Sequence, residues 1–542
     1  MDDSPGRLSR RSLLQGIGAA TATLSLTPAS RAFDDTGGAW WQGDVAHLLP
    51  LVDHRQILLK CSFNSAQSGI PHLRVGDRAV AGRRSDSAGR FWRFHVDKLD
   101  PGKTYQLQLT DERGKARTDP WPLRTFPAPD APATHLRILT FTCAGGDEDI
   151  ATAGGTHFFL ALAARQRLLE RGLSFSPDVV IANGDHVYWD QATSQNKPEP
   201  FARAARDMFA RHGELDPTRP ALGTPNEGVL TRIVDAQIAR LYGVRLRSTP
   251  SFFITDDHDL FENDEATDTL VTLPPDQRML DLARSVQHLY YPEFLPDPTR
   301  PGFLPGSGAP DRLADCSEVF GTLRYGRLLE ALLYDTKRYS TLKGPQATMI
   351  PPAVERWLGA RTASTDTAQL LHMPSTPIGW SAGKWGEWYP DVLQADGRLG
   401  IERAKDYWPH GWWSQHQRLL AMLHAQSGRP PVIVSGDLHA FSSGQILKSG
   451  GLDLANNPVN TLCVGPLGSA GPGFPSFIRG TPPQVPSQLV LDQAFAPLEK
   501  NGFSLLDITP EKIDVRMFAW RPPESAEKIG HLQPFHRYSI AR

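Results

Sequence analysis

Cysteine is scarce in this chain, and its spacing excludes two kinds of scaffold. The four cysteines, Cys61, Cys143, Cys316 and Cys463, are far apart in a chain of 542 residues, and no two of them form a CxxC pair. Zinc ribbons and dense disulfide frameworks both need closely spaced cysteines. The chain is therefore neither of these, although its spacing is compatible with one long-range disulfide.

Net charge is also nearly missing. The 57 Lys and Arg side chains almost balance the 59 Asp and Glu side chains, which leaves a formal net charge of −2. This charge gives no field strong enough to predict attraction to nucleic acid or to a membrane surface. We therefore predict no nucleic-acid partner, and partners must be argued from individual sites.

Long apolar runs are lacking too. No stretch after the N-terminal segment reaches about 18 uninterrupted apolar residues, so no stable membrane span is expected in the mature chain. At the start, Arg10 and Arg11 precede a mildly apolar run and the small-residue site at residues 30–32. This order predicts a twin-arginine signal peptide over 1–32, with the twin-arginine export machinery as a partner and a periplasmic or secreted location.

The remaining composition is that of a folded, soluble protein. Hydrophobic residues make up 40% of the chain and charged residues 21%, and the 13 Trp and 24 Phe argue against general disorder. Residues 37–126 contain short β-rich runs separated by tight turns, which predicts a small all-β sandwich. Its segment LDPGKTY places Tyr105 after a Pro-Gly turn, as in a tyrosine corner, and the segment is similar to fibronectin type III-like modules.

A different pattern follows the Pro- and Ala-rich stretch 127–134, which we interpret as a linker. Apolar strands LRILTFTCA, PDVVIANGD, SFFITDD, EALLYD and PPVIVSGD alternate with helical segments that include 278–289 and 414–425. Residues 135–542 are therefore predicted to be one α/β domain whose sheets present polar groups at their strand ends. Residues 191–232, which are rich in turns, are interpreted as an insertion.

Four motifs at these strand ends carry the candidate chemistry. FTCAGG contains Cys143, NGDHVYWD contains Asp185 and Tyr188, TDDHDLFEND contains Asp256, Asp257, His258 and Asn263, and SGDLHAF contains Asp437 and His439. Hydrolysis of a phosphate ester requires neutralised phosphoryl charge and a water that is deprotonated near neutral pH, and paired metal ions supply both. Carboxylate, phenolate, thiolate and imidazole groups together suit such a centre.

The order and spacing of these motifs resemble calcineurin-like metallophosphoesterases, a group that includes purple acid phosphatases. The cysteine in the first motif, DDH in the third and GDxH in the fourth are similar to the alkaline phosphatase D (PhoD-like) family. The segment LLYDTKRYS (332–340) also resembles that family's LDTRQY segment. The resemblance implies a four-layer α/β metallophosphoesterase sandwich flanked by helices, preceded by a fibronectin III-like domain.

The resemblance also implies roles for particular residues. Asp185 would bridge two metal ions, and Cys143, Tyr188 and His439 would complete a site for Fe(III). Asp256 or Asp257, with Asn263 and Asp437, would hold Ca²⁺. His258 would contact the substrate or protonate the leaving group, and Arg338 would clamp phosphate oxygens with its planar fork.

Other interpretations of these residues stay open. Cys143 could be an inert buried thiol and Tyr188 a packing residue. Asp256 and Asp257 would point in opposite directions if both were in a strand, so one of them could act from outside the ligand shell. Arg338 could equally form a structural salt bridge.

The predicted function is that of a secreted, metal-dependent phosphoric ester hydrolase, a phosphodiesterase and/or alkaline phosphatase that uses a metal-activated hydroxide. Its substrate would be a small molecule, a phospholipid or a wall polymer, with diesters preferred because of the resemblance. Two alternatives remain. One is a phosphotriesterase or lactonase on the same metal site, and the other is a non-catalytic cell-surface binding protein.

Overall fold

The computed structural model describes residues 39–149, 157–189, 201–260, 275–341, 346–382, 392–393, 399–400, 410–470, 473–478 and 482–542. Residues 41–542 form one compact unit, and residues 1–40 are a separate unit. The predicted signal peptide and Asn263 lie outside the described residues.

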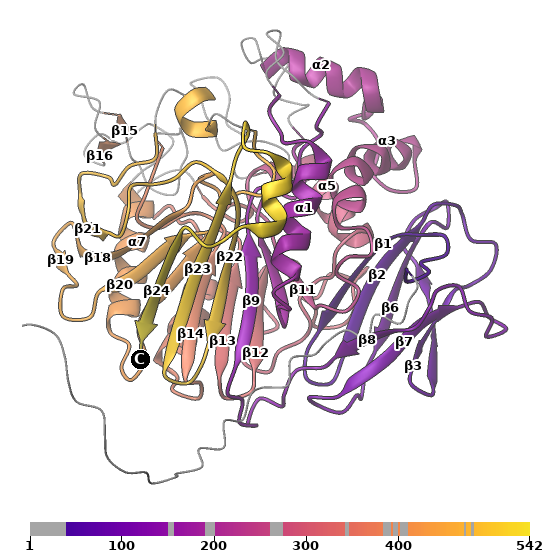
Figure 1. Ribbon diagram of the computed structural model, residues 1–542, viewed down its shortest axis with the longest axis horizontal. Coiled ribbons are helices and arrows are strands. Elements are labelled where there is room, and N and C mark those ends of the chain that lie inside the picture. The colour runs from indigo at the N-terminus through magenta and orange to yellow at the C-terminus, as the bar shows by residue number, and fades with distance from the viewer. Residues whose placement is uncertain are drawn as a thin grey trace, which may run out of the picture. The chain divides into compact units, whose positions relative to one another are not determined.

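The first part of the large unit consists of two antiparallel sheets (Figure 1). One sheet has the order β1-β2-β6-β5 and the other the order β4-β3-β7-β8. The strands are β1 (Val45–Val52), β2 (Ile57–Phe63), β3 (His72–Val75), β4 (Arg78–Ala81), β5 (Arg83–Arg84), β6 (Phe91–Val96), β7 (Thr104–Thr110) and β8 (Trp121–Arg124). We call these two sheets the N-terminal sandwich. The assignment to the fibronectin III class stays a prediction, although this strand order is common in immunoglobulin-like sandwiches.

The predicted tyrosine corner is confirmed. The backbone N–H of Asp100 donates a hydrogen bond of 2.7 Å to the Tyr105 hydroxyl at the start of β7. The bond fixes the turn that connects β6 with β7, because it returns the side chain to the backbone just upstream.

Two further sheets form the main part of the unit. The six-stranded sheet has the order β11-β10-β9-β22-β23-β24, and the larger sheet has the order β12-β13-β14-β17-β20-β18-β19, with β21 paired to β18. The strands of the six-stranded sheet are β9 (Leu136–Phe141), β10 (Val179–Asn183), β11 (Ser251–Ile254), β22 (Asn501–Ile508), β23 (Lys512–Trp520) and β24 (His536–Ala541). Those of the larger sheet are β12 (Phe320–Tyr325), β13 (Leu329–Tyr334), β14 (Gln369–Pro374), β17 (Val432–Ser435), β18 (Ser442–Ser449), β19 (Leu452–Asp453), β20 (Val459–Cys463) and β21 (Leu489–Gln493).

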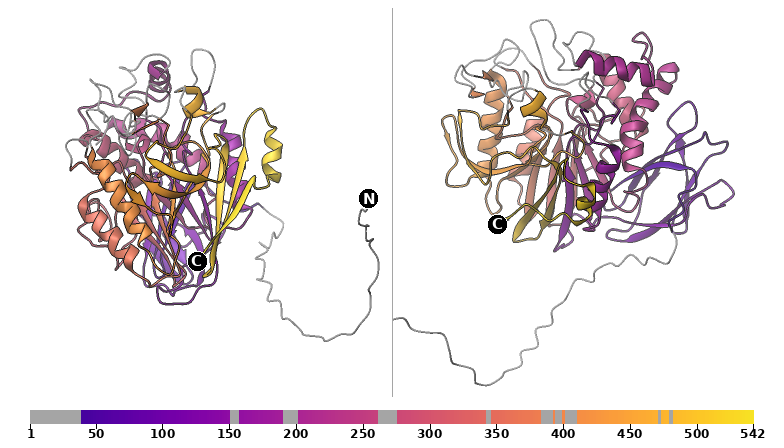
Figure 2. Two further views of the ribbon diagram at one scale, coloured as in Figure 1. Left: turned by 90° about the vertical axis from the view of Figure 1, so that its left-hand side faces the viewer. Right: turned by 45° about the horizontal axis from the view of Figure 1, so that its top comes forward.

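Helices cover the outer face of each sheet. Helices α6 (Pro352–Ala363) and α7 (His410–His424) share one hydrophobic core with the larger sheet, and α1 (Leu162–Leu173) and η5 (Ala526–His531) share another with the six-stranded sheet. The left view of Figure 2 shows the two sheets stacked between these helical layers. The predicted α/β fold, with its sheets between layers of helices, is confirmed.

The remaining elements complete the chain. The helices are α2 (Phe201–His212), α3 (Pro225–Val234), the π-helix η2 (Asp235–Ala239), α4 (Arg240–Tyr242), the 3-10 helix η3 (His258–Leu260), α5 (Gln277–Leu289) and the π-helix η4 (Phe474–Ile478). Short strands β15 (Val392–Leu393) and β16 (Leu399–Gly400) pair with each other. Helix α5 covers the helical segment expected at 278–289, and α7 covers the one expected at 414–425 except for its last residue. The stretch interpreted as an insertion contains α2 and most of α3, so it is not merely a run of turns.

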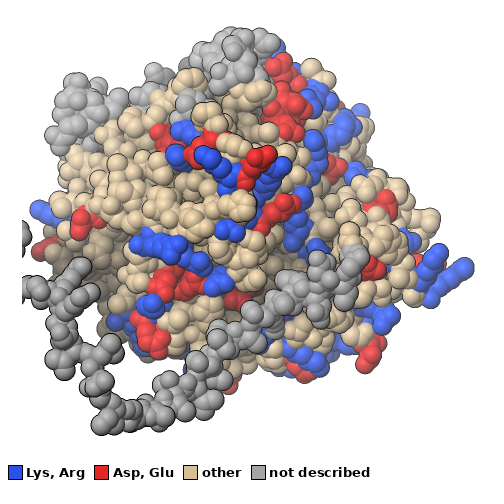
Figure 3. Space-filling view, in the orientation of Figure 1, with Lys and Arg blue, Asp and Glu red and all other residues tan. Residues whose placement is uncertain are grey.

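Three global expectations can be compared with the structure. All four cysteines belong to the described residues, where each is a buried free thiol, so the disulfide that the spacing allowed is not formed. In the described part of the chain, none of the helices is both long and apolar enough to cross a membrane. Lys, Arg, Asp and Glu side chains intermix on the face shown in Figure 3.

Candidate metal centre

Each predicted motif follows a strand whose end lies at a common edge. Strand β9 leads to Cys143, β10 to Asp185, β11 to Asp256 and β17 to Asp437. The first three strands are parallel neighbours, with Ala182 of β10 beside Phe141 and Asn183 beside Ile254. Because the carboxyl ends of parallel strands meet at one edge of a sheet, the loops that follow them lie close together.

A threonine joins this edge to the larger sheet. The Thr142 hydroxyl donates to the carbonyl oxygen of Asn183 at 2.6 Å and accepts from the Asp437 backbone N–H at 3.1 Å. The Asn183 amide in turn donates to the carbonyl oxygen of Pro374, at the end of β14, at 3.1 Å. The ligand-bearing ends of both sheets are therefore tied together by hydrogen bonds.

Four of the predicted ligands have an unusual backbone conformation. The φ angles of Cys143, Asp185, Asp437 and His439 are +49°, +58°, +62° and +52°. Residues with a side chain rarely adopt this left-handed region, and they do so most often where a site requires it. The strand ends therefore turn sharply, as a site that aims side chains at one point requires.

One group of donors combines soft and hard ligand atoms. Donor atoms of Cys143, Asp185 and His439 lie within 4.8 Å of one another. The Tyr188 hydroxyl donates to Asp185 Oδ2 at 3.0 Å, and His439 Nε2 lies 3.9 Å from the same oxygen. None of these four side chains is more than 3% exposed. Thiolate, phenolate and imidazole together suit a transition-metal ion.

A second group contains only carboxylates. Donor atoms of Asp256, Asp257 and Asp437 lie within 4.8 Å of one another, and Asp257 also groups with Asp185 and His258. Strand β11 ends at Ile254, so the alternation of a strand does not apply at Asp256 and Asp257. The structure brings both carboxylates into the cluster. An all-oxygen set of this kind suits a hard cation such as Ca²⁺.

The buried carboxylate atoms provide a test of whether metal ions fit. Within the described residues, Asp185 Oδ1 and both carboxylate oxygens of Asp256 have no hydrogen-bond partner, although both side chains are fully buried. Burying an unsatisfied carboxylate is costly unless a cation or hydrogen-bond donor compensates it. Bound cations would satisfy these atoms, so the residues fit a metal centre.

The electrostatics of the cluster agree with this conclusion. Burial raises the pKa of Asp185 well above its usual value, and the negative charge of Asp257 raises it further. Burial likewise raises the pKa of the Cys143 thiol and of the Tyr188 hydroxyl, with Asp185 adding to both. A bound cation would reverse these shifts, because it favours the deprotonated form of each ligand.

Asp259 holds the loops that carry the ligands, and sequence reasoning missed it. Its carboxylate accepts the backbone N–H groups of Asp185, His186 and Val187 at 2.8–3.0 Å and that of Asp256 at 3.1 Å. The side chain therefore connects the loop after β10 with the loop after β11. The only signal in the sequence was its place at the end of the TDDHD segment.

Arg165 holds the loop that follows Cys143, which we call the cysteine loop, and sequence reasoning missed this residue as well. This buried residue of α1 donates from Nη1 to the carbonyl oxygens of Ala144, Gly145 and Gly146 at 2.9–3.2 Å. Since the loop directly follows Cys143, the contact fixes the turn that presents the thiol.

The neighbouring basic side chains Lys337 and Arg338 lie in different surroundings. Arg338 Nη2 donates to Glu318 Oε2 at 2.7 Å, and both side chains are buried. Lys337 is fully buried, with its Nζ 3.9 Å from Asp437 Oδ2. The lysine, which sequence reasoning did not consider, therefore lies beside the carboxylate cluster, whereas Arg338 forms a buried salt bridge. A phosphate-clamping role of Arg338 stays a prediction.

The remaining predicted site residue among those described is His258. It is 3% exposed at the start of η3, and the centroid of its ring lies 4.1 Å from that of Tyr188. The structure therefore places His258 at the border of both ligand groups, while its catalytic role stays a prediction.

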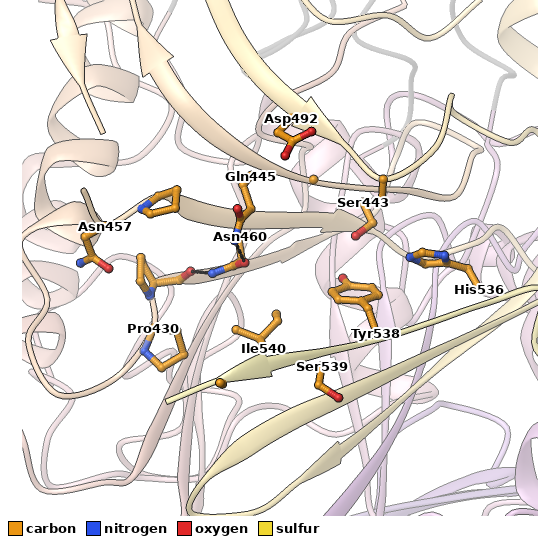
Figure 4. A pocket seen from close by; sticks show the side chains of 15 residues that line it. Pro430, Ser443, Gln445, Asn457, Asn460, Asp492, His536, Tyr538, Ser539 and Ile540 are labelled. Carbon is orange, nitrogen blue, oxygen red and sulfur yellow. Dashed lines mark hydrogen bonds between the residues drawn. The ribbon is translucent and has the colours of Figure 1, made fainter. Parts of the chain in front are cut away.

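A separate pocket lies at the other end of β17. It has a volume of about 410 Å³ and is lined by Pro430, Ser443, Asn460 and Tyr538, among others (Figure 4). Pro430 precedes β17 and Asp437 follows it. No predicted ligand lines this pocket.

Comparison with known proteins supports the fold. The sequence matches no protein-family model and no curated protein. Two sheets between helical layers, with candidate ligands at shared strand ends, agree with the α/β fold that the motifs predict. Among solved structures, the structure of PhoD is similar at a TM-score of 0.56 and 12% identity, with 93% of this chain and 90% of that chain covered. A purple acid phosphatase from yellow lupin (Lupinus luteus) seeds is similar at a TM-score of 0.51 and 12% identity, with 92% and 74% covered.

Proposed function

We propose that this chain is a metal-dependent phosphoric ester hydrolase of the PhoD-like type. The observation that carries the proposal is the convergence of thiol, phenol, imidazole and four carboxylates at one buried point where the ends of two sheets meet. The likeness in fold to PhoD and to a purple acid phosphatase supports it.

The donor types suggest which ions the two groups would hold. We assign Fe(III) to Cys143, Asp185, Tyr188 and His439, and Ca²⁺ to the carboxylates Asp256, Asp257 and Asp437, with Asp185 between the two groups. Soft and phenolate donors suit a redox-capable ion, and all-oxygen donors suit calcium.

The bound ions, His258 and Lys337 would each have a separate role in hydrolysis. When bound, the ions would offset phosphoryl charge and lower the pKa of a water molecule. His258 would contact the phosphate or donate a proton to the departing alkoxide. Lys337 would add a fixed positive charge beside the anionic phosphoryl group.

The substrate and location are part of the proposal. Diesters are the expected substrates, from small molecules to phospholipids or wall polymers, because the motif resemblance points to such relatives. The twin arginines at Arg10 and Arg11 support export by the twin-arginine route to the periplasm or beyond.

The test is hydrolysis of a chromogenic phosphate diester beside the matching monoester, by metal-replete protein with and without chelator. We expect chelator-sensitive turnover that is faster on the diester. Asp185→Asn should lower kcat by roughly 1,000-fold, the scale seen when a main stabiliser of transition-state charge is removed. Asp492→Asn, an exposed position at the separate pocket, is the matched control and should retain full activity.

Three results would contradict the proposal. Full activity of Asp185→Asn would exclude the cluster as the catalytic centre. Turnover confined to phosphotriesters or lactones would favour another ester hydrolase on the same scaffold, and metal binding without any turnover would favour a binding protein.

The metal assignment has its own test. A Tyr188 phenolate on Fe(III) should contribute a visible charge-transfer band, which Tyr188→Phe should remove, leaving the band that the Cys143 thiolate contributes. Tyr242→Phe is a matched control, because Tyr242 is also buried and its hydroxyl has no hydrogen-bond partner within the described residues. A colourless, iron-free and fully active wild-type protein would refute the iron assignment.

A further inference from the structure

Gln237 connects two of the loops that carry the candidate ligands. Its side-chain oxygen accepts the backbone N–H of Gly146 at 2.7 Å and that of Tyr188 at 2.8 Å. Its amide nitrogen donates to the Tyr188 carbonyl oxygen at 3.3 Å. The side chain is 1% exposed, so water cannot replace these bonds.

The element that carries Gln237 is irregular. Gln237 is the central residue of the π-helix η2, which continues from α3 and leads directly into α4. A π-turn inserts an extra residue into a helix, and such turns are frequent at functional sites. The irregularity is therefore a reason to ask what η2 holds in place.

The same π-helix is held by the N-terminal sandwich. Arg90, which precedes β6, donates from Nη2 to Asp235 Oδ2 at 3.1 Å and from Nε to the Phe63 carbonyl oxygen at 3.1 Å. The Tyr290 hydroxyl donates to the other oxygen of Asp235 at 2.7 Å. One side of η2 therefore contacts the sandwich, and the other side contacts the ligand-bearing loops.

We propose that Gln237 is a positioning residue that holds the Cys143 loop against the Asp185–Tyr188 loop for metal binding, and that the Arg90–Asp235 pair anchors its π-helix to the N-terminal sandwich. This inference rests on the proposed metal-dependent function. The hydrogen bonds of the Gln237 side chain go to the backbone of Gly146 and Tyr188 and not to the predicted ligand atoms, so Gln237 acts through that backbone.

The chemistry explains why an amide is needed at this position. Its oxygen accepts two N–H groups from different loops at once, and its nitrogen satisfies a carbonyl group of one of them. Leucine has a similar volume but would leave all three backbone groups without a partner. Glutamate keeps the acceptor and loses the donor, so it should preserve part of the effect.

The experiment compares metal binding by Gln237→Leu, Gln237→Glu and the wild type. Affinity for Fe(III) and Ca²⁺ is measured by competition with a chromogenic chelator, which needs no turnover. We expect roughly 10- to 100-fold weaker binding for Gln237→Leu, the range known for residues that support metal ligands, and a smaller loss for Gln237→Glu. Gln369→Leu is the matched control, because Gln369 is fully buried and donates to backbone carbonyls of Thr509 and Pro510.

A double-mutant cycle tests the anchor. Arg90→Met should weaken metal binding severalfold in the wild-type background and much less in the Gln237→Glu background, because both changes loosen the same element. Additive effects would exclude a connection through Gln237. Equal metal affinity of Gln237→Leu and wild type would overturn the positioning role, and if Gln237→Leu does not fold, equal affinity of Gln237→Glu has the same meaning.

Failure of the proposed function gives a different result. In that case the wild-type protein itself would bind no metal, or would bind metal without hydrolysing phosphate esters. If the wild type binds metal and hydrolyses esters while the Gln237 variants bind metal equally well, only the positioning role is wrong.

Discussion

At the scale of single residues, Lys337 has two opposing effects on the cluster. Its ammonium group lies 3.9 Å from Asp437 Oδ2, and its charge also counteracts the burial that raises the pKa of Asp256. It therefore stabilises the carboxylates when no cation is bound. The same charge repels an incoming cation.

Replacing Lys337 should therefore separate stability from metal affinity. We expect Lys337→Met to lower the free energy of unfolding of the chelator-treated protein by roughly 3 kcal/mol, because it removes a positive charge from beside buried carboxylates. The variant should bind divalent cations more tightly than the wild type. Thermal unfolding with and without chelator, together with calorimetric titration, measures both effects.

An exposed ion pair provides the control for this prediction. Lys512 pairs with Asp514 at 2.8 Å at the surface, and Lys512→Met should change stability by less than about 1 kcal/mol. If Lys337→Met left the stability of the metal-free protein unchanged, the electrostatic role of Lys337 would be wrong.

The sequence predicted the residues that point into the cluster better than the residues that hold it. Cys143, Asp185 and Asp437 could be expected because each follows an apolar strand. Asp259 and Arg165 bind backbone groups, and no side-chain pattern identifies such partners. Sequence reasoning considered Arg338 and not Lys337, and the local pattern does not show which of two neighbouring basic side chains points toward the cluster.

At the scale of elements, the strand-end loops are packed backbone against backbone. A Cβ atom on Gly145 would lie 2.4 Å from the carbonyl oxygen of His186, and one on Gly436 would lie 2.4 Å from that of Asn183. Neither contact can be relieved by moving a flexible side chain. The close approach of the loops therefore depends on glycine at both positions.

Gly145→Ala should push the cysteine loop away from the loop after β10. We expect a loss of roughly 1–3 kcal/mol of stability from overpacking, together with weaker metal binding. Urea unfolding and the chelator competition assay measure the two effects. A metal affinity equal to that of the wild type would show that the spacing of these loops does not determine the metal site.

Gly359 in α6 is a suitable control. A Cβ atom added at Gly359 would have the Met422 side chain as its nearest neighbour, at 3.7 Å, which is an ordinary van der Waals distance. Gly359→Ala should be neutral or stabilise the protein by up to about 1 kcal/mol, because alanine favours the helix.

The strands and helices themselves were largely predictable. Buried parallel strands appear in the sequence as apolar runs, and amphipathic helices appear as apolar residues repeated every three or four positions. Strands β9, β10, β11 and β17 fall within the expected segments, and β13 begins one residue before its segment. The π-helix η2 could not be predicted, because one inserted residue leaves almost the same sequence pattern as a regular helix. The proposed role of η2 depends on its contacts with elements that are distant in the sequence, and a local sequence pattern does not contain such contacts.

At the scale of the whole molecule, buried polar groups join the N-terminal sandwich to the rest of the large unit. His47 is fully buried, with Nδ1 2.6 Å from the Ser62 hydroxyl and Nε2 2.9 Å from the Tyr290 carbonyl oxygen. Lys60 Nζ forms a buried ion pair with Glu293 at 2.7 Å. In the sequence both residues are merely polar positions of an expected β-run, so this docking could not be predicted.

The histidine makes the docking sensitive to acid. Burial lowers the pKa of His47 from 6.5 to about 4, so the folded protein holds the neutral ring. Its contribution to stability is therefore present above pH 6.5 and is lost as the pH falls toward 4. Between pH 7 and pH 5 this single group should cost about 2 kcal/mol of unfolding free energy.

Comparison of His47→Gln with the wild type isolates this effect. The variant should be less stable at pH 7, but its stability should fall less between pH 7 and pH 5, as measured by urea unfolding. His531→Gln, at an exposed position, should follow the wild-type pH dependence. If the free energy of unfolding of His47→Gln and of the wild type fell equally between pH 7 and pH 5, His47 would not be the source of this pH dependence.

The distance along the chain between the candidate ligands has a consequence for the timing of biosynthesis. The Cys143 thiol donates to the Asp437 carbonyl oxygen at 3.6 Å, although 294 positions separate the two residues. A nascent chain on the ribosome cannot assemble the cluster before the segment after β17 has emerged. Metal capture is therefore a late event that follows synthesis of most of the protein, and a chain truncated before Asp437 would lack the site altogether.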